Sequence, residues 1–82
     1  MPQSSDMPTV ARIRKRIDSF GKTDLSIGEV RDAFGVTTDT PIITRITRGE
    51  ISGAKILGEW RIDVASVHNY LDTINKNYNR SI

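Results

Sequence analysis

The sequence predicts a mainly α-helical fold that carries one small β-hairpin. Two patterns support this prediction: apolar residues recur every three or four positions in several segments, and two short apolar runs flank a Gly-X pair that suits a tight turn. The 82 residues are enough for one small domain with a thin core. We divide the chain into a flexible lead (residues 1–8), a basic amphipathic helix (9–22), a main domain (23–75) and a tail (76–82).

The composition excludes several kinds of site. The chain has no cysteine, so it can form neither a disulfide nor a thiolate metal site, and its single histidine cannot build a zinc centre alone. No apolar run is long enough to cross a membrane and no signal peptide is recognisable, so we expect a cytoplasmic protein. No acid pair, nucleophile–base set or phosphate-binding glycine motif stands out, so we expect neither an enzyme nor a cofactor.

Positive charge is concentrated near the N-terminus. The net charge is only +2, but residues 1–22 hold five basic residues against two acidic ones, whereas residues 23–82 hold seven against eight. A local excess of this kind suits one patch that faces a polyanion better than it suits a uniformly basic protein.

The first predicted helix follows Thr9. Its apolar residues are spaced three, four and three apart, at Val10, Ile13, Ile17 and Phe20. Its basic residues lie mostly off that stripe: Arg12, Arg14, Lys15 and Arg16. They could form the solvated outer face of a helix that packs on the domain, or an arm that contacts phosphates, and both interpretations stay open.

Two short helices are predicted next. Ser26 and Glu29 form an S-x-x-E capping box that starts a helix from about Ile27 to Phe34. Gly35 ends it, and Val36 should plug the turn that follows.

The second of these helices is expected from Pro41 to Arg48, capped by Asp39 or Thr40 and stopped by Gly49. Ile42 and Ile46, four residues apart, are expected to face inward together. Outward or flanking positions are left for Thr44, Arg45, Thr47 and Arg48.

The hairpin is predicted from two short runs, residues 54–57 and 60–62, with Gly58 and Glu59 as its turn. Lys55 and Arg61 alternate with apolar residues, so we expect both on the solvent face of this ribbon, while Trp60 pins the ribbon to the helices. A basic helix followed by a small ribbon is the outline of a winged helix-turn-helix, here with an extra N-terminal helix.

A last helix is predicted from Val64 to about Asn75, with Asp63 as its cap. His68 lies beside the apolar stripe of this helix and has no second histidine or cysteine to join it. We expect it to be structural or merely exposed.

Residues 25–71 resemble the excisionase-type winged helix-turn-helix, a small relative of the DNA-binding domain of MerR-like regulators. The shared marks are LSIGEVRDAFGV, ITRGEI, KILGEWRI and a closing helix that ends in YL. The resemblance implies that the second helix of the motif enters the major groove of double-stranded DNA while the wing approaches the minor groove or backbone. It also implies a recombination directionality factor that binds and bends DNA beside a site-specific recombinase. Similar domains serve as transcription regulators and in phage DNA packaging.

The chain departs from that family's usual pattern at several positions. Asp39 stands where arginine or serine is frequent, Ile43 and Thr44 where tyrosine and arginine are frequent, and Glu59 at a wing-tip position that is commonly basic or glycine. These changes remove potential phosphate and guanine contacts, and the basic first helix could compensate.

The candidate DNA-contacting residues are Thr40, Thr44, Arg45, Arg48, Lys55, Arg61, Arg12, Arg14, Lys15 and Arg16. Arginine offers a two-pronged hydrogen bond to guanine or a strong phosphate contact, although Arg45 and Arg48 could instead favour the negative end of their own helix. Cooperative self-association on DNA is expected of so small a factor. The alternative from another class is a protein-interaction module, whose first or last helix binds an acidic partner.

Overall fold

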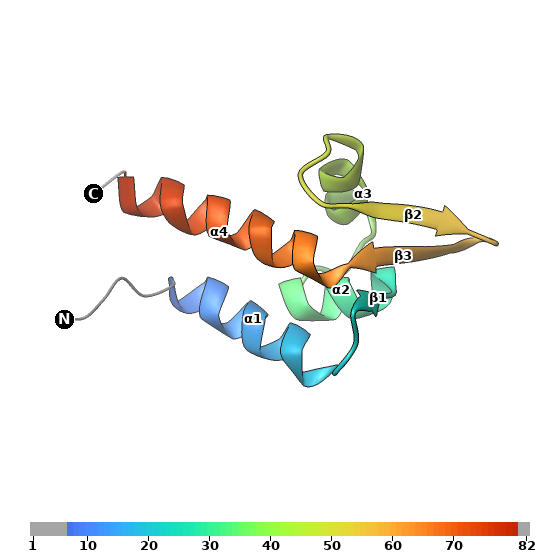
Figure 1. Ribbon diagram of the computed structural model, residues 1–82, viewed down its shortest axis with the longest axis horizontal. Helices are drawn as coiled ribbons and strands as arrows, with labels where there is room; N and C mark the ends of the chain where they lie inside the picture. The colour runs from blue at the N-terminus through green and yellow to red at the C-terminus, as the bar shows by residue number, and fades with distance from the viewer. Residues whose placement is uncertain (1–6, 81–82) are drawn as a thin grey trace.

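The computed structural model describes residues 7–80, which form four α-helices and one three-stranded antiparallel sheet. The elements are α1 (Pro8–Ser19), β1 (Asp24–Leu25), α2 (Ile27–Phe34), α3 (Thr40–Thr47), β2 (Gly53–Ile56), β3 (Glu59–Asp63) and α4 (Val64–Arg80). Figure 1 shows α1 and α4 side by side, with the β2–β3 ribbon projecting away from the helices. The fold is mainly helical, as predicted.

The sheet has one strand more than the predicted hairpin. No strand was predicted outside the hairpin, yet Asp24 and Leu25 pair with Asp63 and Ile62 and place β3 at the centre of the sheet. Leu25 is buried, so this short strand also contributes to the core. β1 thereby ties the base of the ribbon to the helical part of the chain.

One apolar cluster forms the core. The stripe predicted for α1 is confirmed, since Val10, Ile13 and Ile17 are buried, while Phe20 is half-buried just after the helix. The remaining buried residues are Leu25, Val30, Ala33, Ile42, Ile51, Ile62, Val67 and Leu71. None of the residues classed as buried within residues 7–77, whose side chains the structure describes, is polar or charged.

The start and end of α2 follow the prediction. The Glu29 N–H donates to Ser26 Oγ at 3.2 Å and the Ser26 N–H donates to Glu29 Oε1 at 2.9 Å, which completes the capping box. Gly35 ends the helix at φ 74°, in the left-handed region that glycine adopts most easily. Val36 is half-buried against the core, as expected for a residue that fills the turn.

Helix α3 begins and ends one residue earlier than predicted. Thr40 is its first residue and does not cap it; Asp39 occupies the cap position, and its carbonyl accepts from the N–H groups of Ile42 and Ile43. The Asp39 carboxylate makes no capping hydrogen bond, because it lies 3.0 Å from Nε of Arg31 in an ionic contact without hydrogen-bond alignment. Gly49, at φ 77°, follows the end of the helix as expected.

The hairpin turn is Leu57–Gly58, not Gly58–Glu59. Both turn residues have positive φ, 52° and 83°, the pattern of a type I′ turn, which matches the twist of the flanking strands. In the resulting register, Lys55 pairs with Trp60 while Ala54 pairs with Arg61. Lys55 and Arg61 therefore lie on opposite faces of the ribbon, which corrects the prediction that they share its solvent face.

Helix α4 continues to Arg80 instead of ending near Asn75, so the predicted tail is helical through residue 80. Its predicted cap is present, since the Ser66 N–H donates to Asp63 Oδ2 at 3.0 Å. No helix within residues 7–80 has the length and apolar character needed to cross a lipid bilayer. Of the predicted flexible lead, residues 1–6 lie outside the described part of the chain, and Pro8 already belongs to α1.

Candidate nucleic-acid interface

The outward face of α3 is made of threonines and one arginine. Buried Ile42 sets the inward direction, and at 100° per residue the opposite side carries Thr40, Thr44, Thr47 and Arg48. All four are exposed except Thr44, which is half-buried. Arg48 lies at the end of the helix and has no ion pair or hydrogen bond from its side chain to any residue of the described chain. Its guanidinium is therefore available to a ligand.

Arg45 flanks this face and is paired. Its Nη1 lies 3.3 Å from Oε1 of Glu50, in the loop that follows α3. Ion pairs as exposed as this one contribute about 1 kcal/mol or less. Arg45 can therefore exchange Glu50 for an anionic ligand at little cost.

The β2–β3 ribbon is held close to α3 at its base. A Cβ added at Gly53 would lie only 3.1 Å from Cδ1 of Ile46, so the glycine permits this approach. Farther out, Lys55 and Arg61 are exposed and their side chains meet no partner within residues 7–80. They lie on opposite faces of the ribbon, so together with the outward face of α3 they give this end of the molecule free donors on α3 and on both faces of the ribbon. We call Thr40, Thr44, Arg45, Arg48, Lys55 and Arg61 the α3–ribbon surface.

A hollow separates the ribbon from the start of α2 and α3. It is lined by Ser26, Ile27, Asp39, Lys55 and Trp60, together with the turn residues Gly58 and Glu59. Asp39 would repel an anion there, but Arg31 offsets its charge at 3.0 Å. Trp60 is half-buried and packs against the core cluster, consistent with its predicted role as a pin.

Two of the four basic residues of α1 are used within the protein. Arg14 turns toward α4, where its Nη1 lies 2.8 Å from Nδ1 of His68 and its Nη2 donates to the Asp72 carboxylate. Arg16 donates to Asp32 Oδ2 at 2.6 Å and lies 5.0 Å from the centre of the Phe20 ring. These contacts join α1 to α4 and α2, which gives both arginines a packing role.

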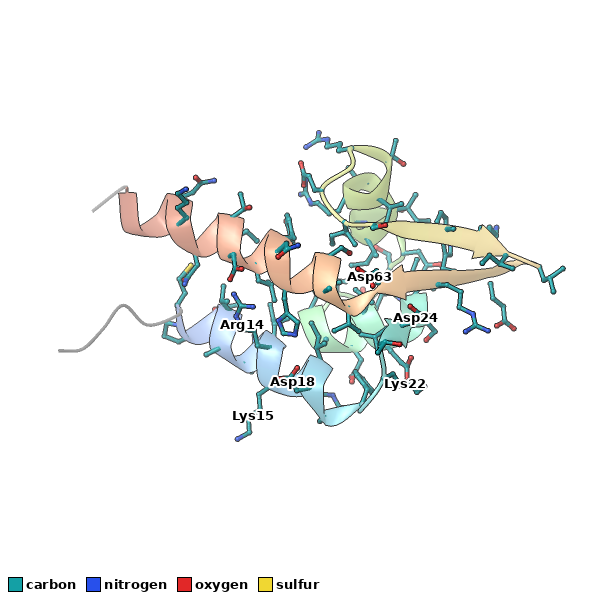
Figure 2. The ribbon with its side chains drawn as sticks, viewed as in Figure 1. Arg14, Lys15, Asp18, Lys22, Asp24 and Asp63 are labelled. Atoms are coloured by element: carbon teal, nitrogen blue, oxygen red, sulfur yellow. The ribbon has the colours of Figure 1, made fainter. Side chains whose placement is uncertain are left out.

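Arg12 and Lys15 are the basic residues of α1 that stay exposed, without a side-chain partner in the described part of the chain. Figure 2 shows Lys15 pointing away from the body of the molecule, whereas Arg14 lies between α1 and α4. In Figure 1, α1 and α3 lie at opposite edges of the view. The exposed cations of α1, Arg12 and Lys15, therefore form a second surface, which we call the α1 surface.

The charged cluster between α1 and α4 was not predicted. His68 is half-buried, and its Nε2 lies 3.2 Å from Asp18 Oδ1 while Arg14 approaches the other ring nitrogen. Since an arginine can only donate, Nδ1 must accept, which places the proton of a neutral imidazole on Nε2. The sequence contains aspartates that can pair with the basic residues of the first helix. It does not show which helices pack together, so this cluster could not be predicted from it.

Comparisons of the chain with models of protein families, with curated proteins and with solved structures found no match. No group of three or more His, Asp or Glu side chains within residues 7–80 is placed to hold a metal ion. The chemistry of the α3–ribbon surface is hydrogen-bond donation and positive charge, which suits a polyanion that also presents hydrogen-bond acceptors.

Proposed function

We propose that this chain is a sequence-specific double-stranded DNA-binding protein built as a winged helix-turn-helix. In this proposal α2 and α3 form the helix-turn-helix, α3 lies in the major groove and the β2–β3 ribbon is the wing over the adjacent minor groove. The observation that carries it is the outward face of α3, where uncharged threonines stand beside the free guanidinium of Arg48.

The residue types on that face support readout of bases as well as phosphates. An arginine can donate two hydrogen bonds to the O6 and N7 acceptors of guanine, and a threonine offers a hydroxyl for base edges and a methyl group for thymine. Lys55 and Arg61 on the ribbon would contact phosphates, which fix the register without reading sequence. Both kinds of contact are needed for specific binding.

The biological role that we propose is that of an excisionase, which binds and bends DNA near a recombination site and acts with a site-specific recombinase. This step rests on the resemblance of residues 25–71 to excisionase-type domains. The chain would then work inside the cell, where its DNA is. A small transcription regulator and a DNA-packaging accessory protein use similar domains and are the alternatives within this class.

One observation favours a second class of function. Lys15 on the α1 surface points away from the body of the molecule, and Arg12 is exposed on the same helix, so both are free to bind an acidic protein. A protein-interaction module would use this surface and would show no preference among duplex sequences.

The test of the proposed function is selection of bound duplexes from a random-sequence pool, followed by titration of the best site at several salt concentrations. We expect an enriched motif and a steep fall of affinity with salt, because each phosphate contact releases counterions. Lys76→Ala is a matched control, since Lys76 is an exposed cation in the C-terminal part of α4, and that end of the helix lies far from the ribbon. No enrichment, and no binding to any duplex at low salt, would overturn the proposal in favour of the interaction module.

A further inference from the structure

The tip of the β2–β3 ribbon exposes two adjacent aliphatic side chains. Leu57 is 99% exposed and Ile56 is 54% exposed, whereas the other leucines, isoleucines and valines of residues 7–80 are buried or half-buried. Exposed apolar surface gains free energy when a partner removes it from water. The tip is the point of the ribbon farthest from the helices, so another molecule can reach it freely (Figure 1).

Neither the turn nor the core accounts for a leucine at position 57. Its φ of 52° lies in the left-handed region, which asparagine, aspartate and glycine tolerate and leucine does not favour. At 99% exposure, its side chain has no packing within the protein that would offset this backbone conformation. An asparagine would suit both the turn and the solvent better. We therefore explain the leucine at position 57 by a contact with another molecule.

The charges near the tip indicate what that contact is. Lys55 lies two positions before Leu57, and Arg61 pairs with Ala54, which lies three positions before Leu57. At a rise of about 3.3 Å per residue, the two cations stand roughly 7 and 10 Å behind the tip. The minor groove of DNA is about 7.5 Å deep. A tip that reached the base edges would therefore bring both cations to the level of the phosphates.

We propose that Leu57 inserts between two adjacent base pairs from the minor groove and kinks the duplex, with Ile56 packed against the groove wall. The inference rests on the proposed function, because α3 in the major groove is what holds the ribbon over the adjacent minor groove. Apolar side chains act as such wedges in minor-groove proteins, and pyrimidine–purine steps unstack most easily. The binding site should therefore carry a TA or CA step under the ribbon tip.

Glu59 limits how deeply the ribbon enters the groove. It pairs with Ile56 across the turn and lies on the same face of the ribbon as Arg61. Its carboxylate would be repelled by the phosphates, so insertion is confined to Leu57 and its turn. Glu59→Gln should tighten binding and leave the position of the kink unchanged.

The experiment compares the wild-type protein with Leu57→Asn and Leu57→Met on a duplex that carries the selected site. A fluorescent base analogue at the step under the tip reports unstacking, and energy transfer between dyes at the duplex ends reports the bend. Asparagine suits the left-handed turn, so Leu57→Asn should unfold at the wild-type temperature or above it. We expect Leu57→Asn to lose the unstacking signal and the bend and to bind roughly tenfold to a hundredfold more weakly, as expected when a buried leucine is removed. Leu57→Met should keep the unstacking signal, the bend and the wild-type affinity.

The outcomes separate this inference from the proposed function. Wild-type affinity, bend and unstacking signal in Leu57→Asn would overturn the inference and leave the proposed function standing. Loss of cooperative binding to adjacent sites, with the bend at a single site intact, would assign the tip to a second copy of this chain and would also overturn it. Failure of the wild-type protein to bind any duplex would overturn both.

Discussion

Arg14 and Arg48 show how surroundings separate a structural arginine from one that is available to a ligand. The side chain of Arg14 is 19% exposed and is held by His68 and Asp72 of α4, more than fifty residues away in the chain. Arg48 ends α3 in solvent without such a partner in the described residues. Nothing local to either residue predicts this difference, because the partners of Arg14 come from a distant helix.

Arg14→Ala should lower the free energy of unfolding by about 1–2 kcal/mol, since it removes charged hydrogen bonds at a partly buried site. Lys15→Ala is the matched control on the next residue of α1 and should change stability by less than about 0.5 kcal/mol. Denaturation in urea measures both values. Equal losses in the two variants would contradict the packing role assigned to Arg14.

Trp60→Ala should also destabilise the protein. Trp60 is half-buried against the core, so we expect a loss of about 2 kcal/mol, somewhat less than for a fully buried tryptophan. Thermal unfolding without DNA measures the change. Unchanged stability combined with lost DNA affinity would mean that Trp60 faces the DNA and does not pin the ribbon.

Among the secondary-structure elements, α2 could be predicted residue by residue, because a capping box and a left-handed glycine mark its two ends. The turn of the hairpin was misplaced because it puts a leucine at positive φ, which local rules disfavour. The end of α4 was missed because its last residues are polar and carry no apolar period. There Asn75 Oδ1 accepts from the Met7 N–H at 2.8 Å, a contact between α4 and the residue before α1 that no local pattern reveals.

The capping box of α2 makes stability depend on pH. The Lys22 ammonium, 2.7 Å from Glu29 Oε2, and the Ser26 N–H lower the pKa of Glu29 below its ordinary value. A lowered carboxyl pKa contributes stability that is fully present above the unfolded-state value, about 4.3, and is lost as the pH falls through the lowered value.

Glu29→Gln should therefore be less stable than the wild type at pH 7, and the difference should shrink toward zero in acid. Urea denaturation at neutral pH and below about pH 4 measures it. Glu59→Gln, at an exposed glutamate without a hydrogen-bond partner in the described chain, is the control and should show little difference at either pH. A Glu29→Gln difference that stays constant with pH would contradict the account of this cap.

For the whole molecule, the residue types of the candidate site could be predicted, but their division into two surfaces could not. The ten candidate residues include four on α1, of which Arg14 and Arg16 are paired with acids on other helices. Which charges stay free depends on how the helices pack, and no single segment of the sequence carries that information. The division matters because a duplex on the α3–ribbon surface leaves α1 at the opposite edge of the molecule, where its exposed cations are free for a second contact.

The most direct test of the proposed reading surface compares two exposed arginines without partners in the described chain, Arg48 on α3 and Arg12 on α1. Binding of Arg48→Ala and Arg12→Ala to the selected duplex and to a scrambled duplex is measured at two salt concentrations. Arg48→Ala should lose about 1–3 kcal/mol on the selected duplex and much less on the scrambled one. Arg12→Ala should lose little binding free energy, and the loss should be equal on the selected and the scrambled duplex. The opposite result would contradict the proposal: Arg12→Ala would lose affinity only for the selected duplex, while Arg48→Ala would lose the same affinity for both duplexes. In that case α1 would be the element that reads the sequence.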